Sequence, residues 1–345
     1  MTNKTITLLS LTAAIAMAAA LFVSQQEQVE QNSQVEHWIQ SVLDNKTQLT
    51  GVKIYSPENK LVIDAQQAND TWLMANSANY QIDTSKLSKW YNQVIGAKNI
   101  EPKTAKPENF ELLGLVNPNS IDQSETENAN AGHLVILTLA GNEHELVFGN
   151  PASSGQFARL ASENQTWLLD DYISMPNQAS DWINTKLFDF KLDDIQSLQS
   201  FSASDPELNW TIERTETEQE GQQEVQEYVL LDTPEERELT YAGVARSHIS
   251  SIANLNFAKV ENFSAEIWQD KESLNKLTVT LVDDKSIEVF IHQAGEQTLL
   301  MVDNKQQMQP KWQFALETYQ TSLVNKSLSS FLKPLEDDNQ QSESE

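Results

Sequence analysis

The N-terminal segment constrains this chain most, because Ile6 to Val23 form an apolar run without a single charge. At about 1.5 Å per helical residue, such a run is long enough to cross the roughly 30 Å hydrocarbon core of a bilayer. Lys4 precedes the run, and the first charge after it is the acidic Glu27. This charge bias favours a cytoplasmic N-terminus and places the bulk of the chain on the far side of the membrane.

Residues 1–23 are therefore expected to be a transmembrane anchor or a signal segment. The three alanines at 18–20 form a small-residue cleavage pattern, but the apolar run continues beyond them to Val23. An uncleaved anchor is favoured, and cleavage stays open as the alternative. The chain contains no cysteine, which excludes a lipoprotein anchor. These features predict a single-pass protein of the bacterial inner membrane with its bulk in the periplasm.

The charge balance excludes nucleic acid as a partner. The net charge is −27, and the few lysines and arginines are scattered rather than gathered into a basic stripe. The lack of cysteine also excludes disulfides, thiolate nucleophiles and cysteine-ligated metals.

Residues 24–49 are interpreted as a juxtamembrane spacer with a short helix, and residues 334–345 as a disordered acidic tail.

Alternating apolar residues between these ends predict antiparallel strands, with one clear helix in each half of the chain. The first helix is expected over residues 84–96, with Trp90 and Ile95 on its buried face. The second is expected over residues 240–255, with Tyr241, Val244 and Ile252 on its buried face.

A repeat is also expected, since residues 134–149 resemble residues 277–292 in alternation and in the position of the turn. Each half then ends on a tryptophan-containing stretch that is interpreted as helical: residues 181–190 in the first half, and a longer stretch that starts with residues 310–319 in the second. The predicted fold class is α+β: two related units, each an antiparallel sheet with a packed helix, after an N-terminal transmembrane helix. The units are placed at residues 50–190 and 191–333.

Several short motifs occur in an order that resembles the DUF4340 domain proteins, a bacterial family. They are DTSKLSKWYNQVIGAKNIEP (83–102), LLGLVNP (112–118), LVFGNP (146–151) and QFARLASENQTWLLDD (156–171). The resemblance covers most of residues 40–330. The family has no established activity, so the resemblance carries over no catalytic residue. Its members resemble products encoded beside ABC-type transporter components, including those related to gliding-motility auxiliary proteins. This implies an accessory role in the cell envelope by association only.

The linear sequence contains no catalytic constellation. There is no HExxH motif, and His144 is expected to point away from the glutamates on either side of it in a strand. The loop GNPASSG (149–155) lacks the spacing of a phosphate-binding loop and is interpreted as a turn. Adjacent acid pairs are interpreted as turns and caps. No catalytic, cofactor-binding or metal-binding residue is therefore predicted.

Arg159 is the one residue for which an interaction or ligand role is predicted. It shares a strand face with Phe157, and it is expected to form a buried or interfacial ion pair or, alternatively, to bind a ligand. The sequence favours a non-enzymatic, membrane-anchored periplasmic accessory protein that binds an envelope or ABC-transporter protein. The alternatives are a ligand-binding module for a transported peptide, glycan or lipid, and, less favoured, an envelope hydrolase.

Overall fold

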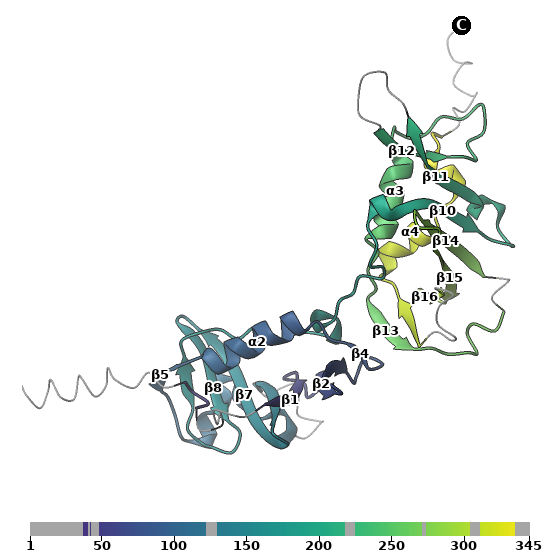
Figure 1. Cartoon of the computed structure of the whole chain (residues 1–345). Helices are drawn as coiled ribbons and strands as arrows, with labels where there is room; N and C mark the ends of the chain where they lie inside the picture. The colour runs from purple at the N-terminus through teal and green to yellow at the C-terminus, as the bar shows by residue number, and fades with distance from the viewer. Residues whose placement is uncertain are drawn as a thin grey trace, which may run out of the picture. The chain divides into compact units, whose positions relative to one another are not determined.

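The computed structural model describes residues 37–40, 42, 48–121, 130–217, 225–270, 274–303 and 311–334. These residues form two antiparallel sheets of nine and eight strands with few helices, so the protein is mostly β (Figure 1). The expected α+β class is corrected in this respect. No helix within the described ranges is long and apolar enough to cross a membrane. The expected anchor lies outside those ranges, as does the acidic tail beyond residue 334.

The chain divides into two compact units. One combines residues up to 73 with residues 82–182, and the other combines residues 74–81 with residues from 183 onward.

The first sheet has the strand order β4-β3-β2-β1-β6-β7-β8-β9-β5. Its strands are β1 (Leu49–Tyr55), β2 (Leu61–Ala68), β3 (Thr71–Met74), β4 (Tyr80–Gln81), β5 (Asn99–Pro102), β6 (His133–Leu139), β7 (Asn142–Ala152), β8 (Gly155–Leu160) and β9 (Trp167–Leu169). Helix α2 (Thr84–Gly96) precedes β5 in the chain.

The second sheet has the order β12-β11-β10-β14-β15-β16-β17-β13. Its strands are β10 (Ile195–Phe201), β11 (Trp210–Thr217), β12 (Val225–Leu230), β13 (Lys259–Asn262), β14 (Asn275–Leu281), β15 (Ser286–Ala294), β16 (Gln297–Asp303) and β17 (Trp312–Ala315). Helix α3 (Val244–Ala253) precedes β13, and the single turn α4 (Thr321–Val324) follows β17.

The two sheets share one topology once the short strand β4 is set aside. Strands β1-β2-β3 and β10-β11-β12 come first in each unit, the helix and an outer strand follow, and a four-strand meander ends it. The two helices therefore occupy the same place in both strand orders, as a repeat requires. Even an irregularity recurs: the register of β1 on β6 shifts between Leu49 and Gly51, and that of β10 on β14 shifts between Ile195 and Ser197.

Helix α2 begins and ends where its sequence predicts. The carboxylate of Asp83 accepts a hydrogen bond from the main-chain N–H of Ser85, which caps the first turn. Leu87, Trp90 and Val94 are buried along one stripe, and the rings of Trp90 and Trp182 lie 5.0 Å apart. Ile95 is only half-buried, so its expected place in the core is corrected.

Helix α3 is shorter than expected because Gly243 adopts a left-handed conformation, with φ of 81°, immediately before it. The helix therefore starts at Val244 instead of 240, and Tyr241 is 53% exposed rather than buried. Val244 and Ile252 do lie in the core, as predicted.

The two tryptophan-containing stretches expected to be helical are mostly extended or irregular over residues 181–190 and 311–317, and only the later part of the second is helical, in the 3-10 turn Thr318–Gln320 and in α4. Residues 181–190 contain only the end of a short 3-10 turn, Ala179–Trp182. Within 310–319, β17 pairs with β13 and with β16, so that Phe314 lies opposite both Val260 and Leu300. Two flanking strands stabilise an extended conformation here, and this tertiary context outweighs the helical spacing of the apolar residues.

Each sheet is covered on both faces. The helix packs on one face, and the connection that follows the outer strand covers the other. In the first unit this connection contributes Phe110 and Leu115, which pack against Leu134, Ile136 and Val147. In the second it contributes Trp268, which packs against the apolar residues Phe290, Leu299, Met301 and Ala315.

His248 is a core residue of the second unit. Its imidazole makes edge contacts with the rings of Trp210, at 5.3 Å, and Phe331, at 5.2 Å. Its Nε2 has no hydrogen-bond partner among the described residues. Burial, together with the charge of Lys326, lowers the pKa of His248 from 6.5 to about 3.

This burial predicts acid sensitivity. Below pH 6.5 the unfolded chain takes up a proton at His248 that the folded chain does not bind, so stability falls as the pH drops from about 6.5 towards 3. Urea unfolding of the second unit should lose about 2 kcal/mol through this residue between pH 7 and pH 5. His248→Leu should remove that part of the pH dependence, whereas His292→Leu, at a half-exposed position, should retain it. An unchanged pH dependence in His248→Leu would show that the imidazole is not held neutral in the core.

Candidate functional site

Arg159, the one residue expected to interact with a ligand or partner, lies in β8 and is 5% exposed. Its guanidinium stacks 4.4 Å from the centre of the Phe110 ring. Its Nε donates to the carbonyl of Leu115 at 3.0 Å. Its Nη1 donates to the carbonyls of Leu160, Ala161 and Glu163 at 3.2, 3.1 and 3.4 Å.

The expected ion pair of Arg159 is not found among the described residues, because main-chain carbonyls take the place of a carboxylate. Through these hydrogen bonds the guanidinium links the end of β8, the turn after it and the covering segment at Leu115. Burial lowers the pKa of Arg159 from its usual value. This geometry orders the chain, and a role of Arg159 toward a ligand stays a prediction.

The motifs that suggested the family also position this segment. Gly114 has φ of 66°, a conformation that favours glycine. A side chain on Gly149 in β7 would place its Cβ 2.3 Å from the carbonyl oxygen of Leu113, so only glycine lets the strand approach so closely. Gln156, which belongs to the same motifs, also bonds to the main chain. Its side-chain Nε2 donates to the carbonyl of Gly149, and its Oε1 accepts from the N–H of Ile173, both at 3.0 Å.

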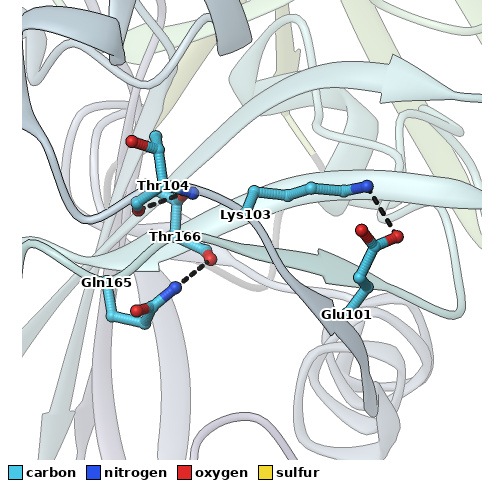
Figure 2. A network of polar contacts seen from close by, with 5 residues as sticks. All are labelled: Glu101, Lys103, Thr104, Gln165 and Thr166. Carbon is cyan, nitrogen blue, oxygen red and sulfur yellow. Dashed lines mark hydrogen bonds and ion pairs between the residues drawn. The ribbon is translucent and has the colours of Figure 1, made fainter.

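A second polar network fastens the outer strand β5, as Figure 2 shows. Thr166 is fully buried; its hydroxyl donates to the carbonyl of Thr104 at 2.8 Å and accepts from the Thr104 N–H at 3.0 Å. Gln165 donates to the carbonyl of Thr166, and Lys103 pairs with Glu101 at 2.7 Å. The Thr104–Thr166 bonds join segments 62 residues apart and support the sheet edge, whereas the Gln165 and Lys103 bonds are local.

One open pocket of about 370 Å³ lies in the first unit, where β7 extends beyond the end of β8. Its lining includes three consecutive residues of β7, together with residues of three other segments: Glu143, His144, Glu145, Val42, Asn117, Leu160, Ala161 and Ser162. The Oε1 of Glu143 also lies 3.9 Å from the Nζ of Lys53.

The histidine and the two glutamates of this pocket belong to opposite faces of the sheet. Glu143 and Glu145 pair with Thr138 and Ile136, whereas His144 pairs with Leu137 on the opposite sheet face. In the described part of the chain, no hydrogen bond joins Ser162 to His144. No set of three or more histidine, aspartate or glutamate residues within the described ranges could hold a metal ion.

The two later acid pairs serve turns, as the sequence indicates, whereas Asp170 of the first pair accepts from the main-chain N–H of Lys98, 72 residues away, at 2.7 Å. Asp171 accepts from the N–H of Tyr172, Asp194 accepts from the N–H of Lys191, and Asp283 accepts from that of Lys285. His133 is mostly buried, and this burial lowers the pKa of its imidazole. The negative charge of Glu58 acts in the opposite direction but is the smaller effect.

The linear sequence could not identify the carbonyl cluster of Arg159, because its acceptors lie up to 44 residues away.

The contacts of Arg159 predict what its replacement does. In Arg159→Lys, a single ammonium group cannot reach the same carbonyls, and the unfolding free energy of the first unit should fall by about 2–4 kcal/mol. Arg246→Lys, at an exposed position, is the matched control and should change stability by less than about 0.5 kcal/mol. Urea unfolding followed by circular dichroism measures both. If Arg159→Lys were as stable as the parent chain, the guanidinium would be free for a ligand instead.

Of three comparisons with known proteins, the one with family models agrees with the motifs. A search of curated proteins and a search of solved structures each return no match. The family model described as Domain of unknown function (DUF4340) matches residues 72–267, a span that runs from β3 past β13 and so includes parts of both sheets. Since this match covers more than half of the chain, the protein belongs to the DUF4340 family.

Proposed function

We propose that this chain is a membrane-anchored periplasmic accessory protein that binds an envelope protein of an ABC-type transport system and catalyses no reaction. The apolar run 6–23 and the charge bias around it support the location. The transport association is supported only by the family resemblance.

The observation that carries the proposal is the way buried polar side chains are used. Arg159, Gln156 and Thr166 bond to the main chain of their own unit. In the second unit the amide of Gln313 accepts from the N–H of Ser264 and from Trp268 Nε1. The hydrogen bonds of these buried polar side chains hold loops in place. This use of polar groups is expected of a binding scaffold.

We further propose that the two units arose by duplication. The shared strand order, the equivalent helices and the register shift at the same point of β1 and β10 support a common origin. A duplicated scaffold of this kind offers its surface, and not an internal cleft, as the variable part.

A second candidate is a ligand-binding module for a transported peptide, glycan or lipid. The pocket beside Glu143, His144 and Ser162 favours it, because its size suits a small ligand. The mixed polar lining fits a peptide or glycan better than a lipid tail.

Two experiments on the full chain test the first proposal. A reporter that is active only outside the cytoplasm, fused after Phe331, should be active, and activity of a cytoplasmic reporter there would refute the location. Crosslinking in membranes at near-native expression should then recover a transporter subunit or another envelope protein. Recovery of no membrane protein would refute the accessory role.

A further inference from the structure

The four outer strands of the two sheets differ in how well they resist pairing with another chain. In the first sheet, β4 has two residues, and β5 has four, ends on Pro102 and is followed by Lys103. In the second sheet, β13 has four residues and begins with Lys259. Short length, proline and lysine are the features that keep exposed strands from associating.

Strand β12 has none of these features. It is six residues long, and its sequence VQEYVL contains neither lysine nor proline. Among the described residues it pairs only with β11, so its other side is an edge of the second sheet (Figure 1). By the same criteria, β12 is the strand best able to accept a further strand.

The main-chain groups of β12 are suitably arranged. The N–H of Leu231 bonds to the carbonyl of Thr211, so the alternation of an antiparallel pair directs the N–H and C=O of Tyr228 and Leu230 away from β11. Within the described ranges, the one bond recorded for these outward groups is from Thr233 Oγ1 to the carbonyl of Leu230, at 3.1 Å. The remaining donors and acceptor are available to an added strand.

The side chains beside this edge are apolar and acidic. Val229 and Leu231 are 41% and 52% exposed on the face opposite the buried Tyr228. Exposed Glu213 and Glu227 lie on the same face as Val229, since Glu213 pairs with it and Glu227 is two residues before it. The nearby Arg214 is paired with Tyr228 on the other face and donates to the carbonyl of Asp193.

The charge of this region selects the occupant. Among the residues between 213 and 236 whose side chains the structure describes, five are acidic and one, Arg214, is basic. A second copy of this chain would bring the same acidic strand alongside, which like charges oppose. An extended segment carrying lysine or arginine next to apolar residues would instead neutralise Glu213 and Glu227 and cover Val229 and Leu231.

We propose that β12 binds an extended basic and apolar segment of the partner protein by strand addition, extending the second sheet. This proposal rests on the proposed accessory function and names the surface that carries it. The main chain of Tyr228 and Leu230 supplies the hydrogen bonds. The exposed aliphatic and acidic side chains supply the selectivity.

The test uses the full chain and a short synthetic peptide in which lysine and valine alternate in pairs, so that both residue types lie on each strand face. Amide hydrogen exchange is followed by nuclear magnetic resonance. The amides of Tyr228 and Leu230 should exchange rapidly in the free chain and slow by about tenfold or more with the peptide. A peptide with glutamate in place of lysine should not slow them.

Val229→Lys together with Leu231→Lys should abolish the protection, because it places positive charge and an edge-blocking side chain on β12. Val282→Lys, at a position 52% exposed elsewhere in the second unit, is the matched control and should retain it. The proposal is overturned if the lysine peptide gives no protection or if both peptides protect equally. It is also overturned if the amides become protected with protein concentration alone, since that would identify a second copy as the occupant.

The same variants separate this proposal from the function on which it rests. If the Val229→Lys, Leu231→Lys chain still crosslinks to an envelope protein in membranes, the accessory role stands and strand addition at β12 fails. If the edge binds the lysine peptide but no envelope protein is recovered from membranes, the accessory role fails instead.

Discussion

The structure depends on covering both faces of each antiparallel sheet. A sheet whose strands are apolar on both sides cannot be stabilised by one helix, and each unit solves this with two different elements. The amphipathic helix covers one face, through Trp90 in the first unit and Ile252 in the second. The connection after the outer strand covers the other, through Phe110 or Trp268.

This two-sided cover accounts for how the buried polar groups are used. An irregular connection laid over a sheet brings main-chain carbonyls and N–H groups into the interior, where each needs a partner. Arg159 and Gln156 supply such partners in the first unit, and Gln313 supplies them in the second. These buried polar side chains are therefore committed to the fold.

The sequence predicts the elements that local rules decide. Helix α2 follows from a capping aspartate and an apolar stripe, and the 134–149 and 277–292 hairpins follow from alternation around a turn. The start of α3 depends on the conformation of Gly243, and the extended conformation of β17 depends on pairing with strands distant in sequence. The role of Arg159 depends on a loop that covers the sheet, so a search for a nearby acid could not find it.

We propose that the chain acts through the β12 edge and not through the pocket beside Glu143. Hydrogen exchange measured by mass spectrometry, on the full chain in native membranes and on the purified chain, tests this most directly. Native membranes should protect residues 225–231 and leave residues 143–145 and 161–162 unchanged. Protection confined to those pocket residues, with 225–231 exchanging equally in both samples, would contradict it.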